Sequence, residues 1–537
     1  MNPAAKNASS FHGRCAALDL TVSLMLEFLS MLSRSVAITA LVLSAASLST
    51  AQPPIPRTAD GRPNLQGIWQ AKNTANDSVA RVVDGGSIPY LPAAAEQRAK
   101  NAAARSTADP LAKCYMPGVP RIMYLEWPFQ ILQTKDHLAM LFEWSLDYRL
   151  IYTNGSPHET RVTPWMGDSR GRWEGDTLVV DVANLSDQTW FDKAGDFHSD
   201  VLHVVERYTM LDSNTIRYEA TIEDPKVFSR PWKISVPLTR QTGRDRLPEF
   251  ACQAQKEEAS GDFEREPRTW YQGPNAPARA MAFTTPVEEH RSSTAPASVR
   301  RTADGKPDLN GLYEPDGGGA NYGLEAHPPS PGSLTPPGRG IMVDPEPDGK
   351  PPFQPWARAE RDVRNTPMRG YDDPTAHCFP AGVPRAMYVP TPFHIVQTAD
   401  KIATLHERMQ WRLISLNRSR HLPDNTRLWQ GDSIGHWDGD TLVVETTNLN
   451  GKTWGSEVGD VFSYAEQVLE RFTPVDDRTI KYEATISDPL VYTRPFTITF
   501  SLRRIPGELF EAACHEEDHD LPVLKRIRDQ ERARLKK

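Results

Sequence analysis

The chain has 537 residues, of which 39% are hydrophobic and 24% charged, and its formal net charge is −8. This length suggests about two to four domains of an ordinary soluble globular class. The acidic balance and the scattered Lys and Arg residues provide no basic face for a phosphate backbone, so nucleic acid is not an expected partner. Sequence motifs that bind nucleotides or iron–sulfur clusters are also missing, so no cofactor is expected.

The N-terminal segment predicts export. Met31-Leu-Ser-Arg34 precedes an apolar run from Val36 to Leu48, and the small residues Ser49-Thr50-Ala51 follow it. This order matches a secretory signal peptide, so residues 1–51 are predicted to be a leader, with Met25 and Met31 as alternative starts. The apolar run is too short to anchor the chain in a bilayer. We expect a periplasmic or secreted protein with no membrane span.

The rest of the chain consists of two similar copies of one sequence unit. The stretch WMGDSRGRWEGDTLVVD, Trp165 to Asp181, recurs in the second half of the chain as WQGDSIGHWDGDTLVVE, Trp429 to Glu445. Similar openings begin each copy, at Arg57 and at Arg301. We expect one domain over residues 52–274 and a second over 301–520. Residues 275–300, rich in Ala, Pro, Ser and Thr, are predicted to be a linker, and residues 521–537 a charged C-terminal tail.

In chain order, each copy begins with one helix and continues as strands. Pro92–Arg105 consists of helix formers with Pro near its first turn, and Pro355–Asn365 is its counterpart. Copy two has about 20 extra residues in the Pro/Gly-rich stretch Asp316–Pro355, which predicts an exposed loop. Seven short runs in copy one predict an antiparallel β-barrel or sandwich: Phe129–Thr134, Leu138–Trp144, Arg149–Tyr152, Thr177–Val182, Leu202–Met210, Thr215–Ile222 and Trp232–Leu238. The stretch from Trp165 to Asp181 itself predicts a β-hairpin.

These motifs resemble those of a family of exported bacterial tandem-repeat proteins of unassigned function. The resemblance rests on Cys-x-x-x-Gly-Val-Pro-Arg, Gly-Asp-Ser-x-Gly-x-Trp-x-Gly-Asp-Thr-Leu-Val-Val and Tyr-Glu-Ala-Thr-Ile-x-Asp-Pro, and it covers nearly the whole mature chain. It implies no reaction. More loosely, the mostly-β pattern is similar to lipocalin-like barrels that bind or transform apolar small molecules, which is an analogy of fold alone.

Four of the five cysteines lie in the mature chain, two in each copy, because Cys15 belongs to the leader. The spacing from Cys114 to Cys252 nearly equals the spacing from Cys378 to Cys514. Four cysteines allow three pairings, and a duplicated unit favours one bridge within each copy. Four free buried thiols are the alternative, although an oxidising compartment favours the bridges.

Several polar residues recur in both copies, where a common core alone would not require them. Among them are Arg121, Glu143, Arg149, Asp168 and Glu206. They are either groups that bind a ligand or buried ion pairs that hold the fold. As ligand-binding candidates we take three charged residues and three tryptophans: Arg121, Glu143, Arg149, Trp165, Trp173 and Trp190. Aromatic side chains at a barrel mouth would favour a flat apolar or aromatic molecule.

Histidines distinguish the first copy. His158 recurs as His421, whereas His198 and His203 of copy one are replaced by Phe462 and Gln467. Imidazoles beside carboxylates suit general acid–base chemistry near neutral pH. Copy one is therefore the preferred catalytic copy, with four candidate catalytic residues: His158, His198, Asp168 and Glu206. Exposed histidines with no role in a reaction are the alternative.

Two formal motif matches have the wrong context. Gly167-Asp-Ser-Arg-Gly171 matches a nucleophile elbow around Ser169, but a strand follows where that motif needs a helix. His515-Glu516-Glu517-Asp518-His519 matches the zinc-peptidase signature, but Pro522 crowds the required helix. We expect no metal ion, and a zinc hydrolase using His515, Glu516 and His519 is a minor alternative.

Two hypotheses for function follow. The first is an exported, cofactor-independent acid–base enzyme of isomerase, lyase or hydrolase type that acts on an apolar or aromatic small molecule. The second is a non-catalytic protein that binds a small molecule or another surface. The sequence leaves the substrate and the oligomeric state open.

Overall fold

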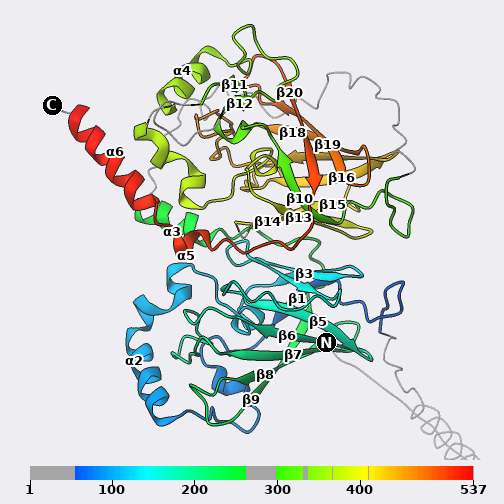
Figure 1. The fold of residues 1–537 in the computed structure, drawn as a ribbon, viewed down its shortest axis with the longest axis vertical. Helices are drawn as coiled ribbons and strands as arrows, with labels where there is room; N and C mark the ends of the chain where they lie inside the picture. The colour runs from blue at the N-terminus through cyan, green and yellow to red at the C-terminus, as the bar shows by residue number, and fades with distance from the viewer. Residues whose placement is uncertain (1–54, 262–297, 330–336, 366, 409, 536–537) are drawn as a thin grey trace, which may run out of the picture. The chain divides into compact units, whose positions relative to one another are not determined.

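The computed structural model describes residues 55–261, 298–329, 337–365, 367–408 and 410–535 (Figure 1). The predicted leader and most of the predicted linker lie outside the described residues, as does Cys15. The chain from Ile55 to Lys537 clusters as one compact unit. Within it, the strands form two closed nine-stranded barrels, one for each copy. The predicted mostly-β fold of two homologous barrels is confirmed.

The first barrel has its strands in sequence order, and it closes where β1 pairs with β9. Its strands are β1 (Gly67–Ala71), β2 (Phe129–Gln133), β3 (His137–Phe142), β4 (Tyr148–Tyr152), β5 (Asp168–Glu174), β6 (Thr177–Ala183), β7 (His203–Asp212), β8 (Thr215–Glu223) and β9 (Trp232–Arg240). The predicted hairpin is β5–β6, which turns at Gly175–Asp176.

The second barrel repeats this plan and closes where β10 pairs with β20. Its strands are β10 (Gly311–Asp316), β13 (Phe393–Gln397), β14 (Lys401–His406), β15 (Gln410–Ser415), β16 (Asp432–Asp438), β17 (Thr441–Thr447), β18 (Gln467–Pro474), β19 (Thr479–Ser487) and β20 (Phe496–Arg504). A small ribbon of β11 (Ala326–His327) and β12 (Gly338–Arg339) lies in the extra stretch of copy two.

Two details differ from the sequence-based expectation. The sequence predicts seven strands in copy one, and the structure has nine. β1 is only five residues long and was not predicted. β5 mixes Gly with charged residues, so it is not among the seven runs, but it is the first strand of the predicted hairpin. The barrels are also not wholly antiparallel, because β4–β5 and β15–β16 pair in parallel. The long connection before each β5-type strand brings it back in the same direction as its neighbour.

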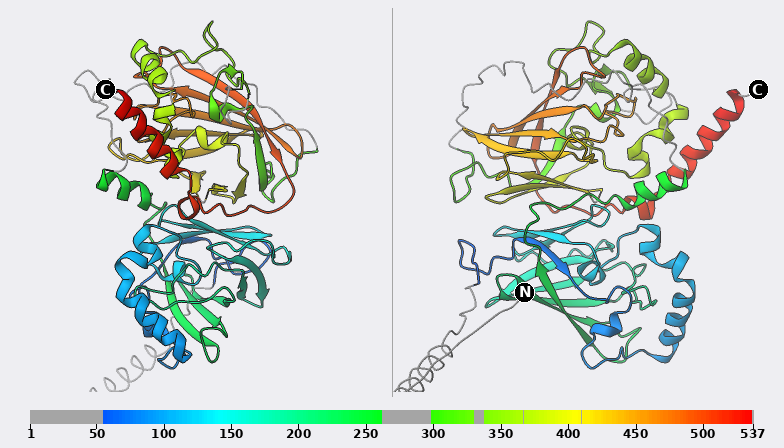
Figure 2. Two further views of the ribbon diagram at one scale, coloured as in Figure 1. Left: turned by 60° about the vertical axis from the view of Figure 1, so that its left-hand side comes forward. Right: turned by 180° about the vertical axis from the view of Figure 1, so that it is seen from behind.

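The predicted helices are present as α2 (Pro92–Ala108) and α4 (Pro355–Arg364), each with Pro in its first turn. Shorter helices are α3 (Cys252–Ser260) and α5 (Cys514–Glu517), and the predicted C-terminal tail forms α6 (Leu521–Leu535). Figures 1 and 2 show α2 running beside the first barrel. Gly195 adopts a φ of 87°, and a Cβ there would lie 2.6 Å from the Ala102 nitrogen, so only glycine fits this contact with α2. No helix in the described part of the chain is both long and apolar enough to traverse a bilayer.

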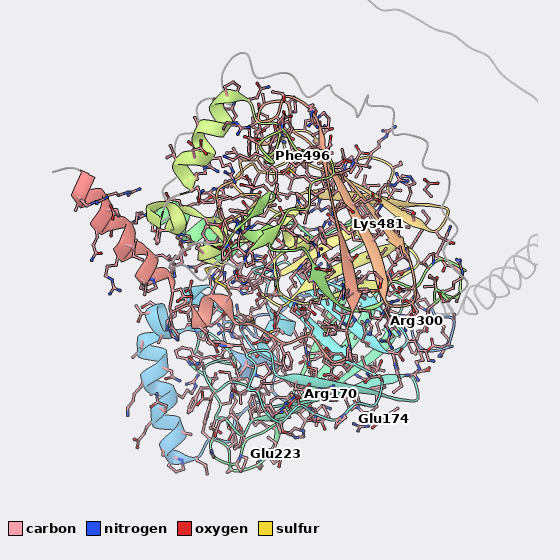
Figure 3. All side chains as sticks on the ribbon, turned by 45° about the horizontal axis from the view of Figure 1, so that its top comes forward. Arg170, Glu174, Glu223, Arg300, Lys481 and Phe496 are labelled. Carbon is pink, nitrogen blue, oxygen red and sulfur yellow. A yellow bond between two sulfur atoms is a disulfide. The ribbon has the colours of Figure 1, made fainter. Side chains whose placement is uncertain are left out.

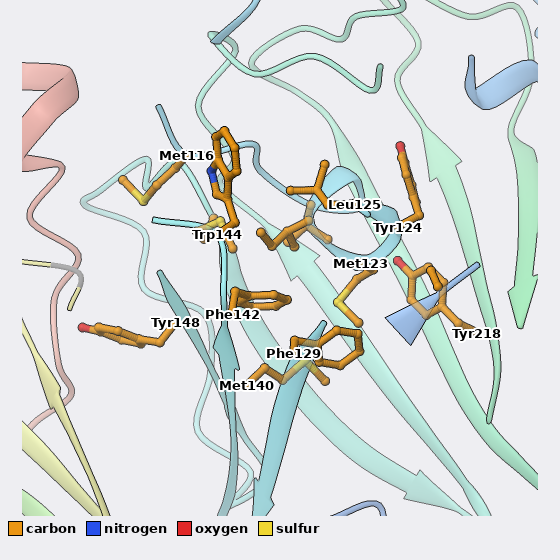
Figure 4. Close-up of a cluster of buried hydrophobic side chains, with 14 of the residues drawn as sticks. Met116, Met123, Tyr124, Leu125, Phe129, Met140, Phe142, Trp144, Tyr148 and Tyr218 are labelled. Carbon is orange, nitrogen blue, oxygen red and sulfur yellow. The ribbon is translucent and has the colours of Figure 1, made fainter. Parts of the chain in front are cut away.

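Alternation along the strands separates the barrel interiors from solvent. In β7, every second residue from Val204 to Met210 is buried. Figure 4 shows the core at one end of the first barrel, where Phe129, Met140 and Phe142 gather beside Met123 and Trp144. Burial of such side chains contributes about 25 cal/mol per Å² of apolar surface and is the main stabilising term of each barrel.

The cysteines pair within each copy, as Cys114–Cys252 and Cys378–Cys514. Both predicted pairings are confirmed. In each pair, one cysteine stands just before the cis Val-Pro segment, and the other begins a short helix after the last barrel strand. The bridges thus fasten the end of each copy to its own barrel. Disulfides of this kind persist in oxidising compartments.

The segments after β9 and after β20, which we call the arms (residues 241–261 and 505–518), reach across to the opposite copy. Glu249 of the first arm accepts hydrogen bonds from the Trp429 and Gln430 backbone N–H groups, at 2.6 and 3.2 Å. Glu511 of the second arm accepts in the same way from Trp165 and Met166, at 2.6 and 3.0 Å. The exchange is reciprocal, because equivalent residues make equivalent contacts in both directions.

Ion pairs extend each arm contact. Arg246 of the first arm lies 2.7 Å from Asp432 of copy two. In the other direction, Glu508 lies 2.7 Å from Arg170, which is labelled in Figure 3. Equivalent barrel strands also touch, since the Trp411 indole donates to the Phe142 carbonyl and the Tyr148 hydroxyl donates to the His406 carbonyl, each at 2.9 Å. The two copies therefore share a pseudo-twofold interface.

The arm carboxylates predict a pH dependence of stability. Burial raises the pKa of Glu249 and of Glu511 from 4.5 to about 7 in the folded protein. A raised folded pKa means that stability is fully present below about pH 4.5 and is lost as the pH rises towards 7. The variant Glu249→Gln/Glu511→Gln should lack this loss, so its melting temperature relative to the native protein should increase from pH 4.5 to 7.5. A difference between the two proteins that stays constant across this range would contradict the assignment.

Candidate functional site

A buried ion pair spans the interior of each barrel. In the first, Arg149 on β4 binds Glu206 on β7 through two hydrogen bonds of 3.0 and 2.5 Å. The Tyr208 and Tyr218 hydroxyls donate to the same carboxylate, and the Arg149 Nε donates to Ser169. Copy two repeats the pair as Arg412–Glu470. The donors and acceptors are engaged with one another, which is the arrangement of a structural pair.

Arg121 is held in the same manner. Its guanidinium makes two hydrogen bonds to Asp109, at 2.7 and 2.9 Å, and a third to Asn76 at 3.0 Å. Arg385 repeats these contacts with Asp373 and Asn321 in copy two. Bidentate pairing of this kind fixes the geometry of both partners. It ties the segment after the first disulfide cysteine to the loop after the first strand of each barrel.

His158 and Asp168 are in contact, with 2.9 Å between His158 Nδ1 and Asp168 Oδ2. The other ring nitrogen lies 3.2 Å from Asp181, and His203 lies 2.9 Å from the same Asp181 oxygen. The result is a chain of two imidazoles and two carboxylates on the outer side of β5, β6 and β7. In copy two the corresponding carboxylates, Asp432 and Glu445, outweigh the cost of burial and raise the pKa of His421 to about 9.

His198 occupies a different environment from His158. It is 3% exposed, with its Nε2 2.7 Å from the Thr189 hydroxyl and its Nδ1 2.9 Å from the Ser199 carbonyl oxygen. Burial lowers its pKa. Among the described residues, no hydrogen bond joins His198 to His158, Asp168 or Glu206. The four predicted catalytic residues thus divide among three places, and only His158 and Asp168 are in direct contact.

The remaining predicted ligand-binding residues lie in different surroundings. Glu143 is partly buried, which raises its pKa, and its nearest cation is Arg244 at 3.9 Å. Trp165 is buried beneath the second arm and packs against Tyr115. Trp173 is partly exposed under Arg62, and Trp190 bridges to Phe197 in the loop that contacts α2. Their binding role stays a prediction.

Neither formal motif finds its required setting. Ser169 lies within β5 and accepts a hydrogen bond from Arg149, so it is not on a strand-to-helix elbow. Helix α5 ends at Glu517, so His515 and His519 do not share a helix face. Glu516 accepts from the Met116 backbone N–H at 2.7 Å. In the described part of the chain, no group of three or more His, Cys, Asp or Glu residues is placed to hold a metal ion.

A cavity of about 120 Å³ opens at one end of the second barrel. Apolar side chains form much of its lining, with Phe379, Ala381 and Ala386 buried. His406 also lines it, and burial followed by the nearby Arg412 lowers the pKa of His406 to about 3, so this ring is neutral. Polar groups complete the lining: Asn321, Tyr322, Thr375, Thr391, Arg408, Gln410 and Glu457.

Copy one fills the equivalent space with aromatic rings. Trp127, Trp144 and Phe250 pack together there, with ring centroids 4.7 to 5.5 Å apart. The strand register sets the correspondence, since Phe129 faces Phe142 in copy one just as Phe393 faces His406 in copy two. Copy two has smaller or polar residues at these positions, namely Thr391 for Trp127, Arg408 for Trp144, Ala512 for Phe250, His406 for Phe142 and Ala386 for Ile122. The cavity therefore arises from residues that differ between the copies.

Charges at the cavity also differ between the copies. In copy one, Lys193 pairs with Glu126 and Asp77 at 3.1 and 3.2 Å. Copy two has Glu457 in place of Lys193, with Pro390 and Tyr322 in place of the two acids. Asn321 orients Glu457 by donating to its carboxylate at 2.8 Å. Burial raises the pKa of Glu457, and the charges of Arg385 and, less strongly, of Arg408 oppose that rise.

The candidates predicted from the sequence do not include the cavity residues, because most of those candidates are polar residues that both copies share. The shared residues proved to be the frame of the fold. The signal for the cavity is present in the sequence as the loss of three aromatic residues and the replacement of Lys193 by Glu457. Without the structure, nothing shows that positions 127, 144 and 250 meet in space.

Comparisons with known proteins leave the function open. No protein-family model and no curated protein matches the chain. Among solved structures, it is similar to a protein of unknown function from the DUF3598 family of Nostoc punctiforme. The identity is 7%, over 73% of this chain and 98% of that chain, with a TM-score of 0.15. A similarity this weak carries no argument about function.

The interior ion pair yields a stability prediction. Glu206→Gln should cost about 3–5 kcal/mol in the free energy of unfolding, because it leaves the buried Arg149 charge without its partner. The double variant Arg149→Met/Glu206→Leu should cost less than the sum of its two single changes. Denaturant unfolding measures both, with Glu219→Gln on the outer face of β8 as a control that should cost at most about 1 kcal/mol. Additive effects of the two single changes would contradict the pairing.

Proposed function

We propose that the protein binds a small molecule in the cavity of its second barrel. The observation that carries the proposal is the replacement of the packed rings Trp127, Trp144 and Phe250 of copy one by Thr391, Arg408 and Ala512. Both copies keep the same strands, arms, disulfides and buried ion pairs. Copy one therefore acts as support, and copy two as the binding domain.

The size of the cavity limits the ligand. Its volume of about 120 Å³ is somewhat below the roughly 150 Å³ of an engineered protein cavity that binds benzene. A molecule with one ring, or a branched chain of similar bulk, fits inside. A longer molecule would have to leave its remainder in solvent. The part-apolar, part-polar lining is typical of ligand sites, in which a few polar groups set the orientation.

The proposed location is outside the cytoplasm. The two disulfides support an oxidising compartment, and the signal-peptide pattern of residues 1–51 supports export to the periplasm or beyond. A binding protein in that setting encounters small solutes directly.

Refilling the cavity tests the proposal. The variant Thr391→Trp/Arg408→Trp/Ala512→Phe gives copy two the three rings of copy one, and it should abolish binding while leaving the fold intact. Binding is detected as a rise in melting temperature across a library of single-ring and branched small molecules, since a ligand at 100 times its Kd stabilises by about 2.7 kcal/mol. Val475→Trp adds an aromatic ring at an exposed turn and should bind as the native protein does. Equal binding by the native and refilled proteins would overturn the proposed site.

Acid–base catalysis by copy one is the second candidate, and one observation favours it. His158 and His203 both contact Asp181, which sets two imidazoles on one carboxylate. Copy two lacks this pair because Gln467 replaces His203. If copy one is an enzyme, His203→Ala should lower the rate about 10²–10⁴-fold, whereas His421→Ala should leave it unchanged. Equal rates for both variants in a metabolite-turnover screen would eliminate this candidate.

A further inference from the structure

We propose that the ligand of the second-barrel cavity is a small zwitterion, such as a free amino acid with an apolar side chain. This inference rests on the proposed binding function and specifies its ligand. Its basis is that one cation and one anion, Arg408 and Glu457, stand at the same cavity without pairing with each other. No salt bridge joins them in the described part of the chain, although Arg408 acts electrostatically on Glu457.

Glu457 is the group that would hold the ammonium end. Two hydrogen bonds with Asn321, each of 2.8 Å, hold Glu457 in place. The Asn321 side chain donates to the Glu457 carboxylate, and the Glu457 backbone N–H donates to the Asn321 carbonyl oxygen. Asn321 is itself fixed by a hydrogen bond from the buried Arg385 at 3.0 Å. At the equivalent position in copy one, Lys193 forms ion pairs with Glu126 and Asp77. Copy two therefore presents an oriented carboxylate with no cation within ion-pair distance among the described residues.

Arg408 is the group that would hold the carboxylate end. The hydrogen bond of its guanidinium that the structure records goes from one nitrogen to the Thr375 carbonyl oxygen at 3.3 Å. A guanidinium has five N–H donors in a planar fork that matches a carboxylate in a bidentate manner. In copy one this position is Trp144, which is 5% exposed in the core. The replacement of the buried Trp144 ring by the Arg408 guanidinium thus has two effects. It places a cation at the cavity rim, and it leaves space that the ring would fill.

The inner part of the cavity suits an apolar side chain. Phe379, Ala381 and Ala386 are all buried, and the neutral His406 ring stacks on Phe393 with centroids 5.3 Å apart. A charged group placed among them would lose its hydration without a partner, which is costly. The charged ends of a ligand therefore belong at Arg408 and Glu457, and its apolar body belongs inside.

Matched ligands test the two charges separately. L-Leucine carries both charges, N-acetyl-L-leucine keeps only the carboxylate, and L-leucinamide keeps only the ammonium. By calorimetric titration, L-leucine should bind the native protein more tightly than either analogue, and each lost charge-assisted contact should weaken binding about 10- to 100-fold. Arg408→Gln should bring L-leucine down to the affinity of leucinamide, and Glu457→Gln down to that of the acetyl compound. Glu457→Lys, which restores the copy-one residue, should weaken binding further.

The outcomes separate this inference from the binding function on which it rests. Equal affinities for leucine and its two analogues, or unchanged leucine binding in both Gln variants, would overturn the zwitterion proposal. If neutral single-ring compounds bind the native protein but not the refilled variant, the cavity is the binding site and only the ligand class is wrong. If neither leucine nor any compound of the library binds the native protein, the proposed function itself fails.

Discussion

The reciprocal contact between each arm and the opposite copy is the constraint on which the rest of the structure depends. Glu249 and Glu511 each bind the backbone at the start of the other copy's β5-type hairpin. Each arm then returns to its own barrel, where Cys252 or Cys514 closes the disulfide. Neither hairpin has its full set of partners unless both copies are present. A duplicated chain held in this way behaves as a dimer joined by one polypeptide, with the two-fold relation that identical subunits normally have.

That relation explains which polar residues both copies keep. Asp168 and Asp432 receive a histidine from their own copy, and the arms add Glu508 beside Arg170 in one case and Arg246 on Asp432 in the other. Inside the barrels, Arg149–Glu206 and Arg412–Glu470 are desolvated pairs whose separation would leave a buried charge. Both copies retain such polar residues because each partner of a pair needs the other. A polar residue that both copies share therefore indicates a role in the fold, and the function is better sought where the copies differ.

The sequence predicted the architecture well because its signals are local. Alternation gave most strands, helix formers after Pro gave α2 and α4, and matched cysteine spacings gave the bridges. β1 was not predicted because its pattern is weak, and β5 was predicted only as part of the hairpin. The parallel pairing of β4 with β5 depends on the path of a long loop. The candidate site was harder to predict, since the residues that line the cavity, such as Thr391, Arg408 and Glu457, come from separate parts of the second copy. Each substitution is inconspicuous in the sequence. The structure shows that the copy-one residues Trp127, Trp144 and Phe250 pack together, so that their loss in copy two leaves space.

The two barrels have the same fold and the same buried ion pairs, but only the second is proposed to bind a ligand. The binding stoichiometry tests this asymmetry most directly. Calorimetric titration of the intact protein with any ligand found by screening should give one site per chain. Hydrogen exchange should then show protection at the residues around Arg408 and Glu457, and none at their counterparts Trp144 and Lys193. Two equivalent sites per chain, or protection confined to the first barrel, would contradict the asymmetry.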